Sequence, residues 1–493
     1  MEINWIRGID DQSLEHKAIW LAELTRQMPE LPLRLATQHR PGHAATHISN
    51  LTAGSSALYC LVTFDDGVCV TIRFPMPGST NASLEISSNE VSVMRYLART
   101  TIIPVPTVLG AGTWDCGLYI VTEFIDGVLL SHHLHMGLDP TSSILTPTLI
   151  PDAELQRAYH CMAQVMLELS KPTFPSIGAL VQTPDAKWTI QSPSPTTMQP
   201  ATAYANPPTP FPRNPFTTAN AYFVDLATQY LHHLFHQRNA GLLPDPVAWK
   251  EKYIARCLFQ RIARSMKTQR GPFRLYSDDF SPANVLVLPN TPSPDIPDTE
   301  TADFSVTSVT NWSSTYIAPN EFTYTAPWWL LFQSSGWEAD LSQFMNKRTP
   351  HLAMFLSVLR SVEDEQVARG TLDIAIARGN GRLSSRMAES LHTGLFWFYL
   401  AARKPRVFDD VYWAFLDGRW FGHLGSLDER LALLSESEME EFDACVEPQV
   451  RGGIWPEGPG VEKGDGDGDG DGDGDGEDGI LEVPGIEPSG GLV

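Results

Sequence analysis

The segment LYSDDFSPANVLV, residues 275–287, carries the strongest functional pattern in the sequence. Asp279 and Asn284 lie five residues apart, and Asn284 is followed at once by an apolar, β-branched run that predicts a strand. A loop of this length lets the carboxylate and the amide face one site. Asp279 is suited to orient or deprotonate a hydroxyl nucleophile, and Asn284 to bind Mg²⁺. A capped turn before a strand accounts for one Asp, but not for the whole arrangement.

Further upstream, Arg73 lies on a predicted strand, residues 68–74. Its even-numbered neighbours are apolar, so the arginine points to the opposite face of the strand. This strand and the one before it, residues 58–64, are separated by Asp-Asp-Gly at 65–67, which is a strong hairpin signal. A cation there is suited to grip phosphate oxygens. An exposed strand arginine is an equally good interpretation of Arg73 alone.

Glu90 favours the first of these interpretations. A helix is predicted over residues 84–99, and Glu90 lies four residues from both Ile86 and Met94 within its apolar stripe. A buried carboxylate is costly unless it is paired, and Arg73 is a natural partner. The alternative is a glutamate on the helix surface.

The remaining patterns place these residues in a chain that changes from strands to helices. A helix over 13–28 precedes the sheet, and another strand pair covers 110–124. Beyond it the pattern is mostly helical, with a Pro- and Thr-rich surface loop predicted over 183–218. The predicted elements of this part are helices at 155–169, 220–238 and 247–266, short strands at 285–288 and 305–309, and helices throughout 338–445.

Composition restricts the class of protein. The 493 residues are 42% hydrophobic, which supplies a large core that must be divided into lobes or domains. The formal net charge of −23 argues against a nucleic-acid partner. The six cysteines are scattered, no secretory signal is evident, and no apolar run is long enough to cross a bilayer. We therefore expect a cytoplasmic protein with no membrane segment and with a disordered Gly/Asp-rich tail.

The loop at 275–287 resembles the catalytic loop H-x-D-x-x-x-x-N of the aminoglycoside phosphotransferase and choline kinase group, and is closest to fungal members of that family. Other segments agree in order over roughly residues 45–445. They are the hairpin at 65–75, the helix and Pro-x-Pro at 90–106, the segment YIVTEFIDG at 119–127 and the aromatic segment at 311–331.

The resemblance implies an α+β, two-lobed protein-kinase-like fold with a small antiparallel-sheet N-lobe and a large, mostly helical C-lobe. Residues 1–44 would form an N-terminal helical extension and residues 45–125 the N-lobe. Residues 126–445 would form the C-lobe with the catalytic loop, and residues 446–493 the disordered tail. The function implied is ATP-dependent phosphoryl transfer, with Mg²⁺, to a hydroxyl of an unidentified small molecule.

The resemblance also assigns roles to individual residues. Arg73 would take the place of the phosphate-gripping lysine, with Glu90 as its ion-pair partner. Asp279 would be the catalytic base and Asn284 a Mg²⁺ ligand. The remaining candidates are the hinge residues that would meet adenine, Glu123, Phe124 and Ile125, and the second metal position, Asn311.

The sequence departs from the family at the metal segment. The family pattern I-D-W-E is replaced by Thr-Asn-Trp-Ser at 310–313, so Asn311 stands where the metal-binding Asp is usual. An amide supplies no negative charge, and phosphoryl transfer depends on a cation that carboxylates hold. Ser277 also replaces the usual His. Two functions follow: a weak phosphotransferase, or a catalytically inactive pseudokinase that binds a nucleotide or a regulatory partner.

Overall fold

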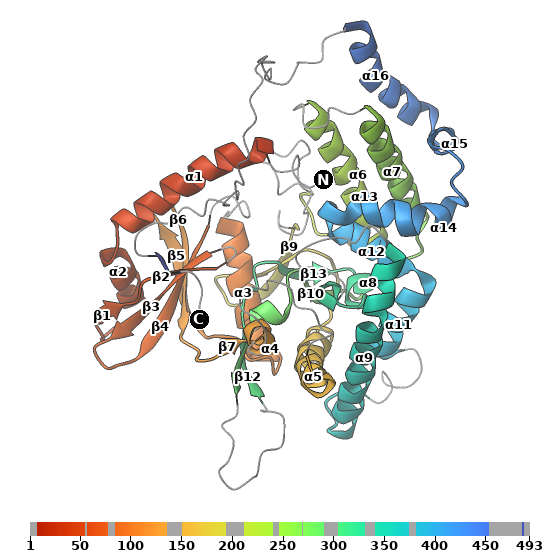
Figure 1. Cartoon of the computed structure of the whole chain (residues 1–493). Coiled ribbons are helices and arrows are strands. Elements are labelled where there is room, and N and C mark those ends of the chain that lie inside the picture. The colour runs from red at the N-terminus through yellow and green to blue at the C-terminus, as the bar shows by residue number, and fades with distance from the viewer. Residues whose placement is uncertain are drawn as a thin grey trace, which may run out of the picture.

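The computed structural model describes residues 7–54, 57–76, 84–135, 150–193, 212–239, 246–268, 270–289, 304–330, 341–373, 381–452 and 486–487. Figure 1 shows an N-terminal part built around a sheet and a larger part that is mostly helical. The predicted α+β arrangement, with an antiparallel N-terminal sheet followed by helices, is confirmed. No described helix is both long and apolar enough to cross a membrane.

The N-terminal sheet has the strand order β14-β2-β3-β4-β6-β5, with β1 paired to β3. All pairings are antiparallel except that of β14 with β2. The predicted hairpin is present: Thr63 faces Cys69, and Gly67 turns the chain with φ +83°, which glycine adopts without steric cost. The strands are β1 (Ala45–Ile48), β2 (Leu51–Ala53), β3 (Ala57–Phe64), β4 (Cys69–Pro75), β5 (Val108–Trp114), β6 (Gly117–Glu123) and β14 (Ile486–Glu487).

Three helices accompany this sheet. The first two, α1 (Arg7–Arg26) and α2 (Glu30–Gln38), share a hydrophobic core with it, in which Leu24, Leu35 and Ile72 are almost completely buried. The third, α3 (Leu84–Thr100), contributes its apolar side chains to the core of the helical part instead. Helix α3 therefore belongs to both halves of the molecule.

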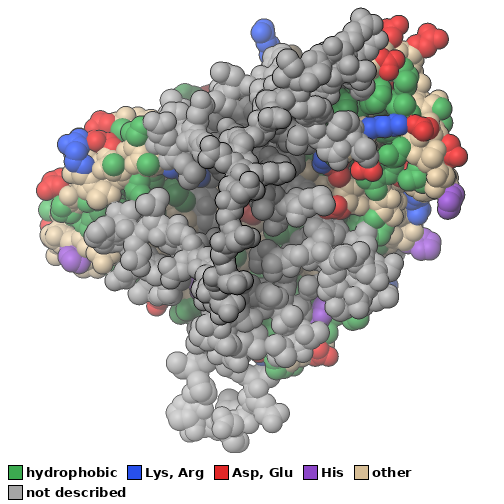
Figure 2. Space-filling model, turned by 45° about the horizontal axis from the view of Figure 1, so that its top comes forward, with side chains coloured by type: hydrophobic (Ala, Val, Ile, Leu, Met, Phe, Trp, Pro, Cys, Tyr) green, Lys and Arg blue, Asp and Glu red, His purple; other side chains and the backbone are tan. Residues whose placement is uncertain are grey.

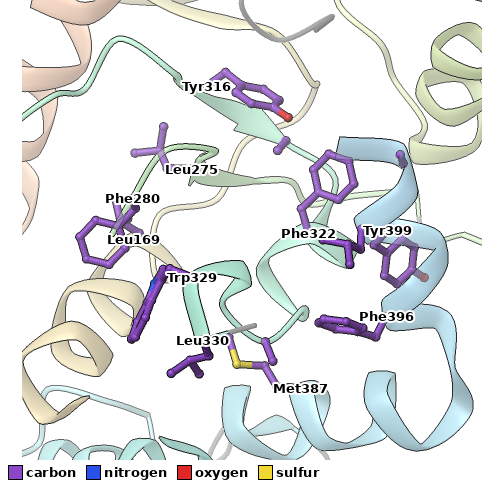
Figure 3. Packing of buried hydrophobic residues seen from close by; sticks show 14 of the residues in the cluster. Leu169, Leu275, Phe280, Tyr316, Phe322, Trp329, Leu330, Met387, Phe396 and Tyr399 are labelled. Atoms are coloured by element: carbon purple, nitrogen blue, oxygen red, sulfur yellow. The ribbon is translucent and has the colours of Figure 1, made fainter. Parts of the chain in front are cut away.

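The helical part contains two further small sheets that position the loop of Asp279. In one, β7 (Val128–Leu129) and β12 (Phe304–Val309) flank β11 (Val285–Pro289); in the other, β10 (Arg274–Ser277) pairs with β13 (Thr315–Ala318). Packed aromatic and aliphatic side chains, shown in Figure 3, join β10 and β13 to the surrounding helices. The longer helices are α5 (Asp152–Leu169), α6 (Ala219–Asn239), α7 (Pro246–Ser265), α9 (Leu341–Ala368), α11 (Leu383–Thr393), α12 (Leu395–Arg403) and α16 (Glu436–Gly452).

The loop predicted over 183–218 is wrong at its start, because β9 (Trp188–Gln191) pairs with β8 (Ala179–Gln182). Trp188 packs edge-on against Tyr96 of α3, with ring centroids 5.2 Å apart, and this distant contact supports a strand that has no local periodicity. Helix α16 extends to Gly452, into the segment predicted as a tail. Residues 453–485 and 488–493 of that tail lie outside the described residues.

The helices are tied together by a buried ion pair. Arg256 of α7, 2% exposed, pairs with Asp409 of α13 (Phe408–Val411), and Lys252 Nζ lies 2.6 Å from the same carboxylate. Burial alone would raise the pKa of Asp409, but the two cations outweigh it and hold that pKa below its usual value. The carboxylate therefore stabilises the fold only while it is ionised.

We expect Asp409→Asn to lower the free energy of unfolding by about 2 kcal/mol at pH 7, since buried Arg256 loses its charged partner. A lowered carboxyl pKa contributes stability above the unfolded value of about 4 and loses it as pH falls through the folded value. The difference from wild type should therefore shrink in acid. Urea titrations at several pH values measure it, with Asp428→Asn, at an exposed ion pair, as the control. A difference that does not depend on pH would contradict the role of the charge.

Candidate functional site

Arg73 and Glu90 form a buried ion pair. The guanidinium Nη1 donates to the Glu90 carboxylate, and the side chains are 12% and 4% exposed. Burial disfavours the charge of Arg73, but the Glu90 carboxylate and Tyr59 together outweigh it, so the pKa of Arg73 stays above its ordinary value. The pairing follows from the two periodicities: Arg73 points off the apolar face of β4, and Glu90 faces it from α3. Glu90 is therefore not a surface residue.

Helix α3 links this ion pair to the loop region of the other half. Asn89, adjacent to Glu90, is completely buried, and its Nδ2 donates to the carbonyl of Thr315 over 2.9 Å. Thr315 begins β13, directly after the segment at 310–313. Two neighbouring residues of one helix thus hold Arg73 of the sheet and the strand that follows Asn311.

The topology brings Asp279, Asn284 and Asn311 together. The loop at 278–284 connects β10 to β11, and the turn at 310–314 connects β12 to β13. Because β10 pairs with β13 and β11 with β12, the loop and the turn must face each other. Backbone hydrogen bonds join them at both ends: Asp278 N donates to Ser314 O over 3.1 Å, and Thr310 N to Asn284 O over 2.8 Å.

Within this arrangement the three side chains form one hydrogen-bonded cluster. Asn311 Nδ2 donates to Asp279 Oδ2 over 2.7 Å and to Asn284 Oδ1 over 3.4 Å. The Ser313 hydroxyl donates to Asn311 Oδ1 over 3.0 Å and so holds the amide in this orientation. Asn311 has φ +59°, a left-handed conformation that Asn and Asp adopt more readily than other side chains.

A lysine from distant sequence completes the surroundings of the loop. Lys404, just beyond α12, donates from Nζ to the carbonyl of Asp278 over 3.2 Å, and its ammonium lies 4.2 Å from the centre of the Trp328 ring. Burial raises the pKa of Asp278 to about 6 and also raises the pKa of Asp279, while Lys404 acts in the opposite direction on both. A carboxylate whose pKa is shifted toward neutrality is a more effective general base than an exposed one.

The predicted hinge connects the two halves of the molecule. Glu123 ends β6, and its carboxylate accepts hydrogen bonds from the backbone N and the hydroxyl of Thr107, both over 2.8 Å. Phe124 and Ile125 follow as half-buried residues outside regular structure. Gly127 has φ +149°, and a Cβ there would meet the carbonyl of Val287 at 3.1 Å, so the close approach of this connection to β11 requires glycine.

The donor set at Asn311 fits a Mg²⁺ ion poorly. Mg²⁺ in such sites is held through one or two carboxylates together with substrate phosphates. Here the cluster holds one carboxylate, Asp279, and an amide nitrogen of Asn311 is directed at both oxygens that would otherwise face a cation. The Asn311 amide thus already hydrogen-bonds two of the oxygens that a cation would need.

Two long-range contacts around the cluster were not predicted from sequence patterns. Lys404 carried no local signal, because its contact with the loop spans 126 residues. The link between Asn89 and Thr315 spans 226 residues and was likewise unpredicted.

Figure 2 shows one face of the molecule, on which acidic and basic side chains lie interspersed at both edges of the described surface.

Comparison with known proteins gives likeness at the level of structure. No protein-family model matches the sequence, and no curated protein matches it. An aminoglycoside 2'-phosphotransferase-IIIa mutant in complex with GDP is 14% identical, with a TM-score of 0.36 over 83% of this chain and 97% of that chain. A macrolide 2'-phosphotransferase from Brachybacterium faecium is 13% identical, with a TM-score of 0.35 over 78% and 98%. An amicoumacin kinase in complex with AMP-PNP and Ca²⁺ is 11% identical, with a TM-score of 0.38 over 86% and 94%.

Proposed function

We propose that this chain is a kinase-like phosphotransferase that binds ATP and passes its γ-phosphoryl group, slowly, to a hydroxyl of a small molecule. The observation that carries the proposal is the facing pair of turns that brings Asp279, Asn284 and Asn311 into one cluster. The buried pair of Arg73 and Glu90 supports it, because helix α3 holds this pair and the strand after Asn311 through neighbouring residues.

In the proposed reaction the acceptor oxygen attacks the γ-phosphorus of ATP. The bond from that phosphorus to the bridging oxygen breaks, and ADP leaves with the electron pair. Asp279 takes the proton of the acceptor hydroxyl, for which its buried position and raised pKa suit it. Arg73 would bind phosphate oxygens, with Glu90 fixing its orientation, and the adenine would lie against residues 123–125.

The reaction should be slow because Asn311 replaces the second carboxylate that would hold a cation in the site. Phosphoryl transfer is accelerated mainly by positioning and by cations that stabilise the phosphate oxygens. Asn311 removes one carboxylate from the place where a metal would be held. Asn284 and Asn311 would bind a metal only through neutral oxygens, and hydrogen bonds already engage both side chains.

A second function is favoured by the same amide. Asn311 Nδ2 donates to the Asp279 carboxylate, which would act as the base. This hydrogen bond favours the ionised form of Asp279 and so opposes its uptake of a proton. On this alternative the chain is a pseudokinase: it binds a nucleotide or a partner in the same site and transfers nothing. The phosphotransferase and a nucleotide-binding pseudokinase share ATP binding and differ in turnover.

Titration calorimetry of the full chain with ATP, in Mg²⁺ and in EDTA, tests the shared step. We expect ATP to bind in both, with dissociation constants that differ by less than about threefold, because the protein itself contributes a poor metal site. Binding that requires Mg²⁺ would contradict the interpretation of Asn311. A protein that binds ATP in neither condition would refute the phosphotransferase and the nucleotide-binding pseudokinase.

A further inference from the structure

A small cavity lies beside the loop of Asp279. Tyr276, Ser277 and Phe280 line it from the loop side, and Trp328 and Trp329 line it from the segment after β13. Its volume is about 30 Å³. Figure 3 shows Phe280, Leu275 and Trp329 on one side of this region and Phe322 on the other. Tyr276 and Trp328 are half-buried, and the cavity is partly open to solvent.

Three residues that line the cavity carry hydrogen-bond donors that have no partner in the part of the chain that the structure describes. The Thr323 hydroxyl and the indole Nε1 atoms of Trp328 and Trp329 are buried, and none of them is hydrogen-bonded to a described residue. Thr323 and Trp329 are 6% and 9% exposed. Unpaired buried donors cost free energy, and a bound group that accepts hydrogen bonds would remove that cost.

Two consecutive cations stand behind the aromatic walls. Arg403 is 3% exposed, its guanidinium lies 4.9 Å from the centre of the Tyr276 ring, and both of its Nη atoms lack a hydrogen-bond partner among the described residues. Lys404 lies against the ring of Trp328 and beside Asp278, as described above. Tyr276 and Trp328, the two half-buried aromatic residues of the lining, thus each have a positive charge over one face. No Asp or Glu is among the described residues that line the cavity.

We propose that this cavity binds the acceptor of the phosphotransferase proposed above, and that it takes the carboxylate of a small hydroxylated acid. That the ligand is the acceptor rests on the proposed function. The preference of the cavity for a negatively charged group does not depend on that function. The space corresponds to about two water positions, which two carboxylate oxygens can occupy. The hydroxyl of such an acid would lie toward Asp279, two residues beyond Ser277 in the wall.

The same features exclude a polycationic acceptor. An aminoglycoside needs carboxylates to receive its ammonium groups, and here it would meet Lys404 and Arg403 instead. Lys404 is the residue on which the preference depends most directly, because it is half-buried and lies between the cavity wall and the loop. It is a specificity-determining residue in this proposal, not a catalytic one.

The test is titration calorimetry of the full chain, without nucleotide, using mandelate, its neutral amide mandelamide, and kanamycin as probes. Mandelate and mandelamide differ only in the charged group. We expect mandelate to bind at least about tenfold more tightly than mandelamide, the effect of a hydrogen-bonded charge, and kanamycin to bind least. Equal or tighter binding of mandelamide or kanamycin would overturn the proposal, and so would a protein that does not bind mandelate.

Variants identify the residue responsible. Lys404→Met should reduce the preference for mandelate to less than about threefold, whereas Lys404→Arg should keep it. Lys187→Met, at a lysine 81% exposed, is the control and should also keep it. An unchanged preference in Lys404→Met would refute the assignment. Titration of wild type with ATP separates the two hypotheses. A protein that prefers mandelate but does not bind ATP would refute the phosphotransferase alone. A protein that binds ATP but shows no preference for mandelate would refute the acceptor class alone.

Discussion

Replacing Asn311 by Asp should turn a metal-poor site into one that depends on Mg²⁺. The amide nitrogen that lies 2.7 Å from Asp279 Oδ2 becomes a carboxylate oxygen, so two negative charges meet at hydrogen-bond distance. Without a cation this repulsion should lower the free energy of unfolding by about 1–3 kcal/mol. With Mg²⁺ the two carboxylates and Asn284 form the ligand set that hard cations prefer. The substitution keeps the left-handed backbone, which Asp tolerates.

The expected results are a Tm that Mg²⁺ raises in Asn311→Asp but not in wild type, and phosphoryl transfer at least about a hundredfold faster than wild type, since a bound metal supplies several kcal/mol. Thermal unfolding with Mg²⁺ or EDTA, and ADP release from ATP, measure the two effects. Asn50→Asp adds the same charge at an exposed position and is the control. Adding Asp279→Ala to Asn311→Asp should abolish the gain.

Either of two outcomes would contradict this reasoning. If Mg²⁺ shifts the Tm of wild type and Asn311→Asp equally, Asn311 does not control the metal. If Asn311→Asp gains Mg²⁺ dependence of Tm but no turnover, the chain is the pseudokinase of the second function.

The second large effect is expected at the ion pair of the sheet. Arg73→Ala leaves the Glu90 carboxylate, 3% exposed, without its cation. Removing one member of a buried ion pair typically costs about 3–5 kcal/mol, because the other charge stays buried and uncompensated. Urea unfolding measures this loss. Arg26→Ala removes the cation from the exposed pair with Glu23 and should change stability far less, because solvent screens that pair.

Stability alone would not show that Arg73 binds phosphate, so a double variant separates the two roles. Arg73→Met with Glu90→Leu replaces both charges by apolar groups and should recover most of the lost stability. It should still bind ATP at least about tenfold more weakly than wild type, since the cation for the phosphates is gone. A double variant that is stable and binds ATP as tightly as wild type would show that the pair is structural only.

Local patterns in the sequence were sufficient for the elements of the fold. The Asp-Asp-Gly turn between two alternating runs predicted the hairpin of β3 and β4, and the 3.6-residue stripe predicted α3 with Glu90 on its buried face. The spacing from Asp279 to Asn284 placed a polar loop before a strand, and the ladder of β11 and β12 follows it. These signals lie within a few residues of one another, so the chain encodes them locally.

The tertiary structure alone decided how those elements make a site. The pairing of β10 with β13 and β11 with β12 brings Asn311 onto Asp279 and directs its amide toward the carboxylate. The chain path also places Lys404 against the loop. Such contacts depend on packing between segments far apart in the sequence, and no local periodicity records them. Residue types and short spacings therefore determined the elements and the candidate residues, whereas long-range packing determined their partners and the charge balance of the site.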